Sequence, residues 1–409
     1  MRVNPGTRPI NRPRLSTLWV GGTGSSLGTP ARWSAVTLFL AAAGTTLTIG
    51  LREPFVSYAF EIVVFLLAAS WCFARGNPMP LVPAGALAGI SSWGFGQLAL
   101  GATVYRHATL QTSLRYAALG ATAWTAFRIF SSVSAHLAFL KVFAWFGAAV
   151  GVISVAAYFT SPGKMFWLFD AAYPDVWGCF PSRNNFAQFL ELSMPVALWL
   201  GLREGRGPYV WLAAAMVASG IASASRAGAC ILVLEAAIVL LGHRNLPSLR
   251  RSALEFVLAV VVFAAIPGMG ILAGRLAAPN PFEARREIAQ STLRMIESRP
   301  WAGLGLGAFA VVYPEFATFD SGRTVDHAHD DWLEWSAEGG VLFAGFWLVL
   351  AAQSARPAWR TGWGTGVAGC FLHATVDYPF ARFGISAWAF ILIGMLAATS
   401  LREVPHPRH

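Results

Sequence analysis

The segment FGISAWAFILIGMLAATSL, at residues 383–401, decides the fold class of this chain. Its 19 residues include no ionisable side chain, and about 20 predominantly apolar residues are enough for a helix to cross the hydrocarbon core of a bilayer. Comparable apolar segments recur from residue 33 onward. The sequence therefore predicts an all-α integral membrane protein.

About twelve such segments are expected, with one long hydrophilic interruption. They cover residues 33–51, 54–74, 80–104, 112–130, 137–159, 184–202, 208–224, 228–242, 253–273, 338–355, 361–379 and 383–401. The Pro-, Gly- and Arg-rich start lacks the short apolar core of a cleavable signal peptide. The expected organisation is a disordered cytoplasmic tail at 1–32, nine spans within 33–273, a large loop at 274–337, three spans within 338–401, and a cytoplasmic tail at 402–409.

The composition excludes several classes of protein. Hydrophobic residues make up 56% of the chain and charged residues 12%, whereas about a quarter of residues are charged in soluble domains. Disorder and a small disulfide scaffold are therefore excluded. The four cysteines are far apart and show no Cys-x-x-Cys or Cys/His spacing, so they indicate neither a metal site nor a disulfide framework.

The net charge of +10 comes from arginines scattered over short loops. Nucleic-acid binding requires basic residues clustered on a solvated face, so no nucleic-acid partner is expected. Arginines such as Arg244, Arg250 and Arg251 instead concentrate in alternate loops, which is typical of the cytoplasmic side of a membrane protein. Both termini are therefore expected in the cytoplasm. The loops at 160–183 and 274–337 are expected in the periplasm.

Four polar clusters fall on that outer side. The first is FPSRNNFA at residues 180–187, where Arg183 and the free amide groups of a starting helix could hold a phosphate. It could instead be a plain helix start, with Asn184 as the capping residue and Phe186 as an anchor at the membrane interface.

The second cluster is the turn SASRAG at residues 223–228. Its small residues bring two helix backbones close together. A guanidinium held there suits a pyrophosphate, which arginine binds through two parallel hydrogen bonds. The alternative is that Arg226 only extends to the lipid headgroups.

The third cluster lies in the long loop. Arg285 and Arg286 open a segment with Ile288, Leu293 and Ile296 on roughly one face, which predicts an amphipathic helix lying on the outer leaflet. A glycine-rich stretch follows at residues 300–309. A nucleotide site is not expected there, because the stretch does not sit between a strand and a helix.

The fourth cluster is DHAHDDWLEW at residues 326–335, followed by EGG at 338–340. Two histidines and three aspartates in six residues invite a metal interpretation, but this spacing without a distant third ligand is a poor match to known sites, so no metal is expected. One histidine could instead act as a general base oriented by a carboxylate. A solvated acidic loop is the third interpretation.

Taken in order, these clusters resemble the O-antigen ligase and O-antigen polymerase superfamily of bacterial envelope glycosyltransferases. The resemblance covers about residues 170–400. It rests on F-x-N-R-N-x-F-A at 180–187 with Ser182 in place of the first Asn, S-R-x-G at 225–228, the glycine-rich stretch, H-N-x-x-L at 329–333 with Asp330 in place of Asn, E-x-G at 338–340, and H-x-x-x-D-x-P at 373–379.

This resemblance implies a glycosyltransferase-C-like fold and transfer of a glycan from a polyprenyl-pyrophosphate carrier to an acceptor hydroxyl. The reaction would take place at the periplasmic face of the inner membrane, in O-antigen or exopolysaccharide ligation or polymerisation, without a cofactor or metal. The acceptor would be a glycan, a lipid or a protein. The essential arginines of the family map onto Arg226 and either Arg285 or Arg286, and its essential histidine maps onto His329.

A mechanism follows from this assignment. His329 would remove the acceptor proton, oriented by Asp326, Asp330 or Asp331, and the arginines, including Arg183, would hold the charged leaving group. The predicted substrate-binding residues are Arg183, Asn184, Asp326, His327, Asp330, Asp331 and Glu338.

The alternative function is a transporter or flippase for a lipid-linked or anionic sugar. Transport residues are expected near the middle of the membrane. The candidates at that depth are Glu61, Arg115, Arg128 and Lys141.

Overall fold

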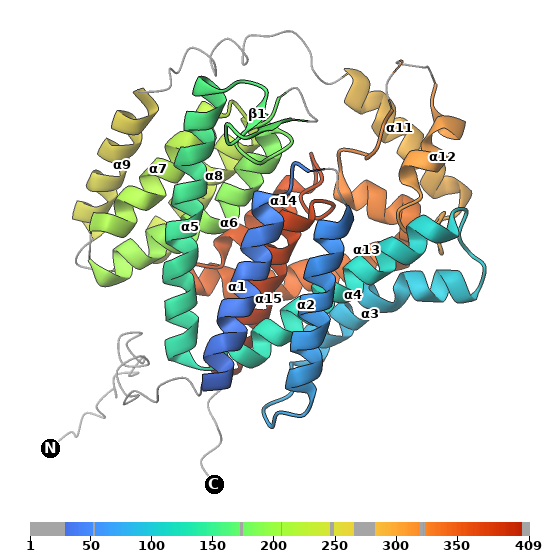
Figure 1. Cartoon of the computed structure of the whole chain (residues 1–409), viewed down its shortest axis with the longest axis horizontal. Coiled ribbons are helices and arrows are strands. Elements are labelled where there is room, and N and C mark those ends of the chain that lie inside the picture. Colours follow the sequence, from blue (N-terminus) through green and yellow to red (C-terminus); the bar gives the residue numbers. More distant parts are fainter. Residues whose placement is uncertain are drawn as a thin grey trace, which may run out of the picture.

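The computed structural model describes residues 29–51, 54–171, 175–205, 207–245, 249–265, 283–318, 322 and 324–402 (Figure 1). Helices make up 77% of the structure, and 14 of them lie within the described residues. The predicted helical class is confirmed. A pair of two-residue antiparallel strands, β1 (Lys164–Met165) and β2 (Phe169–Asp170), was not predicted.

The helices follow the apolar segments of the sequence. They are α1 (Thr29–Leu47), α2 (Pro54–Cys72), α3 (Leu81–Ala99), α4 (Arg106–Ile129), α5 (Val133–Thr160), α6 (Arg183–Glu204), α7 (Gly207–Ala222), α8 (Arg226–Gly242), α9 (Leu249–Ala265), α11 (Glu283–Ser298), α12 (Phe309–Phe316), α13 (Asp331–Thr361), α14 (Thr365–His373) and α15 (Phe383–Arg402). Each of the twelve predicted segments overlaps one of these helices, although residues 266–273 of the ninth segment lie outside the described residues.

Four helices in the described part are long and apolar enough to cross a membrane: α2, α5, α13 and α15. Others carry more charge; α4, for instance, includes Arg106, Arg115 and Arg128. Helix α14 has only 9 residues, or about 14 Å, and so is much shorter than the segment predicted at 361–379. An all-α membrane protein is thus supported, while the number of twelve crossings stays a prediction.

Helices α6 and α15 form the centre of the molecule, and the others surround them (Figure 1). In the apolar stretch of α15, residues 383–401, 89% of the residues are buried inside the protein. Trp388 of this helix stacks on Phe143 with 4.4 Å between ring centroids and donates a hydrogen bond to Thr46 at 2.8 Å. Large apolar side chains such as Leu66 and Val261 are exposed on the peripheral helices instead, as expected of surfaces that face lipid.

Helices α11 and α12 lie with the β1 strand pair at the edge of the helical body opposite the start of α1 (Figure 1). They enclose a small second core with Ile288, Met295 and Phe309 at its centre. The prediction of one apolar face with Ile288, Leu293 and Ile296 was wrong for Leu293, which is 48% exposed. Five positions of a helix turn through about 500°, which places Leu293 far from Ile288 around the axis.

The glycine-rich stretch is fixed by two buried side chains. The Glu338 carboxylate accepts hydrogen bonds from the amides of Gly307 and Phe309 at 2.8 and 2.9 Å. The Gln97 amide donates to the carbonyls of Ala302 and Glu338 at 2.7 and 2.8 Å. This stretch is therefore attached to both α3 and α13.

Gly340 bends α13 just after this attachment. Its φ of 78° lies in the left-handed region, and a Cβ at this position would collide with the carbonyl of Trp301. The amide of the next residue, Val341, donates to Pro300 at 2.8 Å. The bend thus depends on glycine.

We expect Gly340→Ala to lower stability by about 1–3 kcal/mol, because it adds both backbone strain and a clash. Gly345→Ala in the same helix is the matched control, because a Cβ there meets nothing within 4 Å. This control should be neutral or stabilise the protein by up to about 1 kcal/mol. Thermal unfolding of the detergent-solubilised variants measures both, and equal midpoints would contradict the role of the bend.

Candidate active site

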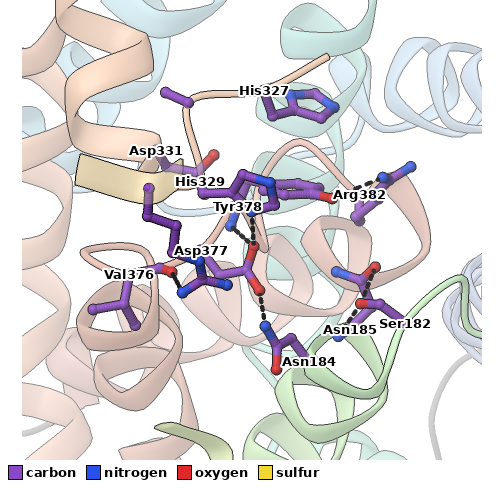
Figure 2. Close-up of polar contacts among 12 residues, drawn as sticks. Ser182, Asn184, Asn185, His327, His329, Asp331, Val376, Asp377, Tyr378 and Arg382 are labelled. Carbon is purple, nitrogen blue, oxygen red and sulfur yellow. Dashed lines mark hydrogen bonds and ion pairs between the residues drawn. The ribbon is translucent and has the colours of Figure 1, made fainter. Parts of the chain in front are cut away.

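The start of α6 and the segment before α13 meet at a buried carboxylate, Asp377, in the turn between α14 and α15 (Figure 2). Its Oδ2 accepts a hydrogen bond from the Asn184 side chain in α6 at 2.5 Å, and its Oδ1 lies 3.4 Å from His329 Nδ1 just before α13. The side-chain oxygen of Asn184, Oδ1, accepts a hydrogen bond from the hydroxyl of Ser225, the capping residue of α8, at 2.9 Å. The starts of α6, α8 and α13 are therefore linked through one network.

The start of α6 differs from the sequence interpretation. Ser182, not Asn184, is the capping residue, and its hydroxyl accepts from the amide of Asn185 at 3.2 Å. Phe186 is fully buried against Trp177 and Phe180, so it is not an anchor at the surface. The side chain of Asn184 is thereby free to reach Asp377.

The turn before α8 is as tight as predicted. Ala224 adopts a φ of 55°, and Ser225 accepts from the amide of Gly228 at 3.2 Å. A Cβ at Gly228 would collide with Ala187 of α6, so the two backbones approach closely here. This packing fixes Arg226, the first residue of α8, beside the start of α6.

His329 has the geometry of a general base. Its φ of 54° is uncommon for a residue with a side chain, and such conformations concentrate at functional sites. About a third of its side chain is exposed. Because Nδ1 faces Asp377, Nε2 is the nitrogen that can reach a substrate.

Asp377 suits the role of partner to this histidine. Burial by itself would raise the pKa of its carboxyl, but the hydrogen bond from His329 and the charges of His373, His329 and Arg285 lower the pKa below its usual range. Asp377 is therefore ionised at neutral pH and can orient the imidazole. Asp326, Asp330 or Asp331 was expected to orient His329, whereas the carboxylate beside its Nδ1 in the structure is that of Asp377.

These three aspartates have other surroundings. Asp326 is exposed. Asp330 caps α13 by accepting from the amide of Leu333 at 3.0 Å. Buried Asp331 accepts from the amide of Phe380 at 2.9 Å, and its own amide donates to Ala374 at 2.9 Å. Asp330 and Asp331 thus hold the start of α13 and the turn that carries Asp377.

The ring of Tyr378 lies between the other polar groups of the site (Figure 2). His327 stacks on it with 4.3 Å between ring centroids, and His329 meets it edge-on at 5.0 Å. Arg382 donates to the Tyr378 hydroxyl at 3.2 Å, and His327 Nδ1 lies 2.9 Å from Glu334 Oε1. The two histidines of the motif therefore have different carboxylate partners.

The predicted arginines differ in position. Arg285 donates to the carbonyl of Val376 at 3.0 Å, next to Asp377, whereas Arg286 is exposed. Arg183 lies 3.6 Å from Asp175 in the loop before α6. Predicted Glu338 has both carboxylate oxygens bonded to the glycine-rich stretch. Of the arginine pair, Arg285 is the one near the histidine.

Sequence reasoning missed two carboxylates that are buried within the helices. Glu191 in α6 and Glu235 in α8 are 0% and 1% exposed, and Glu191 Oε1 lies 2.7 Å from Nδ1 of fully buried His373. Their signal was simple, since an acidic residue inside an apolar segment is itself a functional candidate. Among the described residues, no three or more His, Cys, Asp or Glu side chains are arranged to hold a metal ion.

Burial destabilises the ionised form of the Asp330 carboxyl. Desolvation raises the pKa of this carboxyl from 3.8 to about 6, although hydrogen bonds from the amides of Leu333 and Trp332 counteract it. As the pH rises through this interval the unfolded chain loses its proton first, so the folded state loses stability. Below this interval both states are protonated and the cost disappears.

We therefore expect Asp330→Asn to stabilise the protein near pH 7 by about 1–2 kcal/mol after allowance for solvent screening, because Asn caps helices as well as Asp does. The gain should shrink as the pH falls toward about 4. Thermal unfolding at both pH values measures it, with exposed Asp326→Asn as the control. A gain that does not depend on pH would contradict the explanation.

Residues 210–350 match the model of the O-antigen ligase family. This segment includes Arg226, Arg285 and His329, whereas Asn184 and Asp377 lie outside it. The match confirms the predicted resemblance to the O-antigen ligase superfamily. No curated protein matches the chain.

Proposed function

We propose that this chain, which shares its central segment with the O-antigen ligases, transfers a glycan from a polyprenyl-pyrophosphate carrier to an acceptor hydroxyl at the periplasmic face of the inner membrane. The observation that carries the proposal is the pair of His329 and Asp377, beside the joined starts of α6 and α8. His329 supplies a base, and Arg183 and Arg226 at the two helix starts supply positive charge for the leaving group.

The proton transfer follows from the direction of the imidazole. His329 Nε2 takes the proton of the acceptor hydroxyl while that oxygen attacks the anomeric carbon of the donor sugar. Asp377 accepts a hydrogen bond from Nδ1–H of His329 and stabilises the imidazolium that forms, while the proton stays on the ring. The bond from the anomeric carbon to the phosphate oxygen breaks, and its electron pair leaves with the lipid pyrophosphate. Attack opposite the leaving group inverts the anomeric centre.

The leaving group needs positive charge in a dry site, since fixed charges stabilise a transition state best where water is excluded. Arg183 and Arg226 stand at the first positions of α6 and α8, whose amino ends carry partial positive charge. Arg285 extends from α11 to the turn that carries Asp377, where it donates to the carbonyl of Val376. Helix starts and arginines are both suited to a pyrophosphate.

The other residues of the site, which include Tyr378 beside the predicted ones, divide into three groups. Asn184 has both ends of its amide engaged by Asp377 and Ser225, so we assign it to positioning the carboxylate. His327 and Tyr378 present aromatic rings next to His329, and we assign them to contact with the sugar. We assign Asp330, Asp331 and Glu338 to holding the backbone around the site, and exposed Asp326 to contact with the substrate at its rim.

A transporter or flippase is the second candidate. The buried carboxylates Glu191 and Glu235, with His373, favour it, because transport sites are expected at mid-membrane depth. It predicts movement of a lipid-linked glycan without a change in its covalent structure, which separates it from the transferase.

We expect His329→Ala to slow glycan transfer by about 10²–10⁴-fold, the usual contribution of a general base. Asp377→Asn should slow it as well. The assay is mass spectrometry of the products that the purified protein in nanodiscs forms from polyprenyl-pyrophosphate-linked oligosaccharide. Exposed His107→Ala is the matched control and should keep the original rate.

Transfer at the original rate by His329→Ala would contradict the base assignment. Longer carrier-linked chains would indicate a polymerase, and products that require an added lipid or protein acceptor would indicate a ligase. If the unmutated protein forms no product under either condition, the transporter is the better explanation.

The two neighbouring arginines give a second comparison. We expect Arg285→Ala to reduce transfer far more than Arg286→Ala, because Arg285 contacts the turn that carries Asp377 while Arg286 is exposed. Initial rates at saturating acceptor measure both, and thermal unfolding checks that each variant is folded. An equal or greater loss in Arg286→Ala would overturn the choice of Arg285.

A further inference from the structure

A second polar cluster lies inside the helical bundle and includes His373, the first residue of the H-x-x-x-D-x-P motif. It consists of Glu191 in α6, Glu235 in α8 and His373 at the end of α14, and all three are at most 1% exposed. Glu235 stands nine residues after the start of α8, or about 14 Å along its axis. The cluster is therefore deep among the helices and beneath the candidate active site.

The cluster leaves several polar atoms without a hydrogen bond. Only Oε1 of Glu191 and Nδ1 of His373 are paired with each other, at 2.7 Å. Within the described part of the chain, both Glu235 oxygens, Glu191 Oε2, His373 Nε2 and the amide nitrogen of neighbouring Gln188 have no partner. Buried polar atoms are nearly always satisfied, so these atoms point to a ligand or to waters between them.

The packing makes room for these carboxylates. A Cβ at Gly369 of α14 would collide with Glu235 Oε1, so the carboxyl lies directly against the backbone of that helix. A Cβ at Gly366 would collide with the carbonyl of Glu191, so α14 also approaches α6 closely. Two glycines three residues apart thus place both carboxylates beside α14.

The charges around Glu235 do not balance if every group is ionised. Glu191 is the ionisable neighbour whose charge acts on it. The other titratable groups on helices that pack against α8 are Tyr209 on α7; Arg183, Arg203 and Glu204 on α6; Cys370 and His373 on α14; and Asp331, Glu334, Glu338, Arg356 and Arg360 on α13. His373 is paired with Glu191, and this pair is neutral when both members are charged.

A second carboxylate in this interior would then be an uncompensated charge, which is strongly unfavourable in the low-dielectric interior of a protein. A proton removes that cost more simply than any other ligand, because no group of described residues is arranged for a metal ion. The same proton can also supply one of the missing hydrogen bonds, since a protonated carboxyl is a donor.

We propose that Glu235, Glu191 and His373 form a proton-binding site inside the helical bundle, in which Glu235 carries the bound proton and His373 forms an ion pair with Glu191. The proton binds to one carboxylate oxygen of Glu235, and no other bond changes. The site does not depend on the proposed glycan transfer. The proton-binding site adjoins the candidate active site, since the backbone amide of Asp377 donates to the backbone carbonyl of His373 at 3.0 Å.

Infrared difference spectroscopy of the full chain in nanodiscs tests this site near pH 7. We expect the spectrum of the unmutated protein minus that of Glu235→Gln to contain the carbonyl band of a protonated carboxylic acid, and this band should shift in D₂O. Glu255→Gln is the matched control, because Glu255 is paired with exposed Arg251 at 2.7 Å and should contribute only carboxylate bands.

A difference spectrum with carboxylate bands alone would overturn the proposal. Thermal unfolding provides an independent measure, because Gln has the shape of a protonated Glu and Glu235→Gln should unfold within a few degrees of the unmutated protein. A large gain in stability would mean that Glu235 is buried as an anion, which also overturns the proposal. If the band is present but glycan transfer is absent, the proposed function fails while the proton site stands.

Discussion

The carboxylate of Asp377 is the interaction on which the arrangement of the site depends. It accepts from Asn184 on one side and faces His329 on the other, while Asn184 also accepts from Ser225. Segments that are far apart in the chain are thus brought to one point. The same carboxylate is buried, so it needs these donors, and the donors in turn fix a histidine and the starts of two helices. The hydrogen bonds that stabilise this buried charge are therefore also the contacts that position His329 and the two helix starts.

Most helices could be predicted because they rest on a local property, a run of apolar residues near the length of a span, whereas the 8-residue α12 and the 9-residue α14 do not. The partner of His329 could not, because Asp377 is 48 residues away and Asp330 and Asp331 are adjacent to the histidine in sequence. The cap of α6 illustrates the same limit. Ser182 and Asn184 are both good capping residues, and only the contact with Asp377 decides between them.

The buried carboxylates show a different limit. The charged residues expected at membrane depth were Glu61, Arg115, Arg128 and Lys141. The carboxylates of Glu191 and Glu235, which were not expected there, are buried more completely, at 0% and 1% exposed. Hydropathy says that a charge lies in an apolar segment, but not whether its side chain faces protein or lipid. That depends on packing, here on the glycines of α14, and packing is a property of distant segments.

The burial of α15 constrains the order in which the molecule can be assembled. Of the four described helices that are long and apolar enough to cross a membrane, α15 is the most completely surrounded by protein, and every described helix that contacts it precedes it in the chain. Those helices are therefore synthesised before the helix that fills their common centre. The aromatic residues that line it, Phe143 among them, find their final partner only after residues 383–402 have left the ribosome. Completion of this core therefore follows the synthesis of all the described helices that surround it.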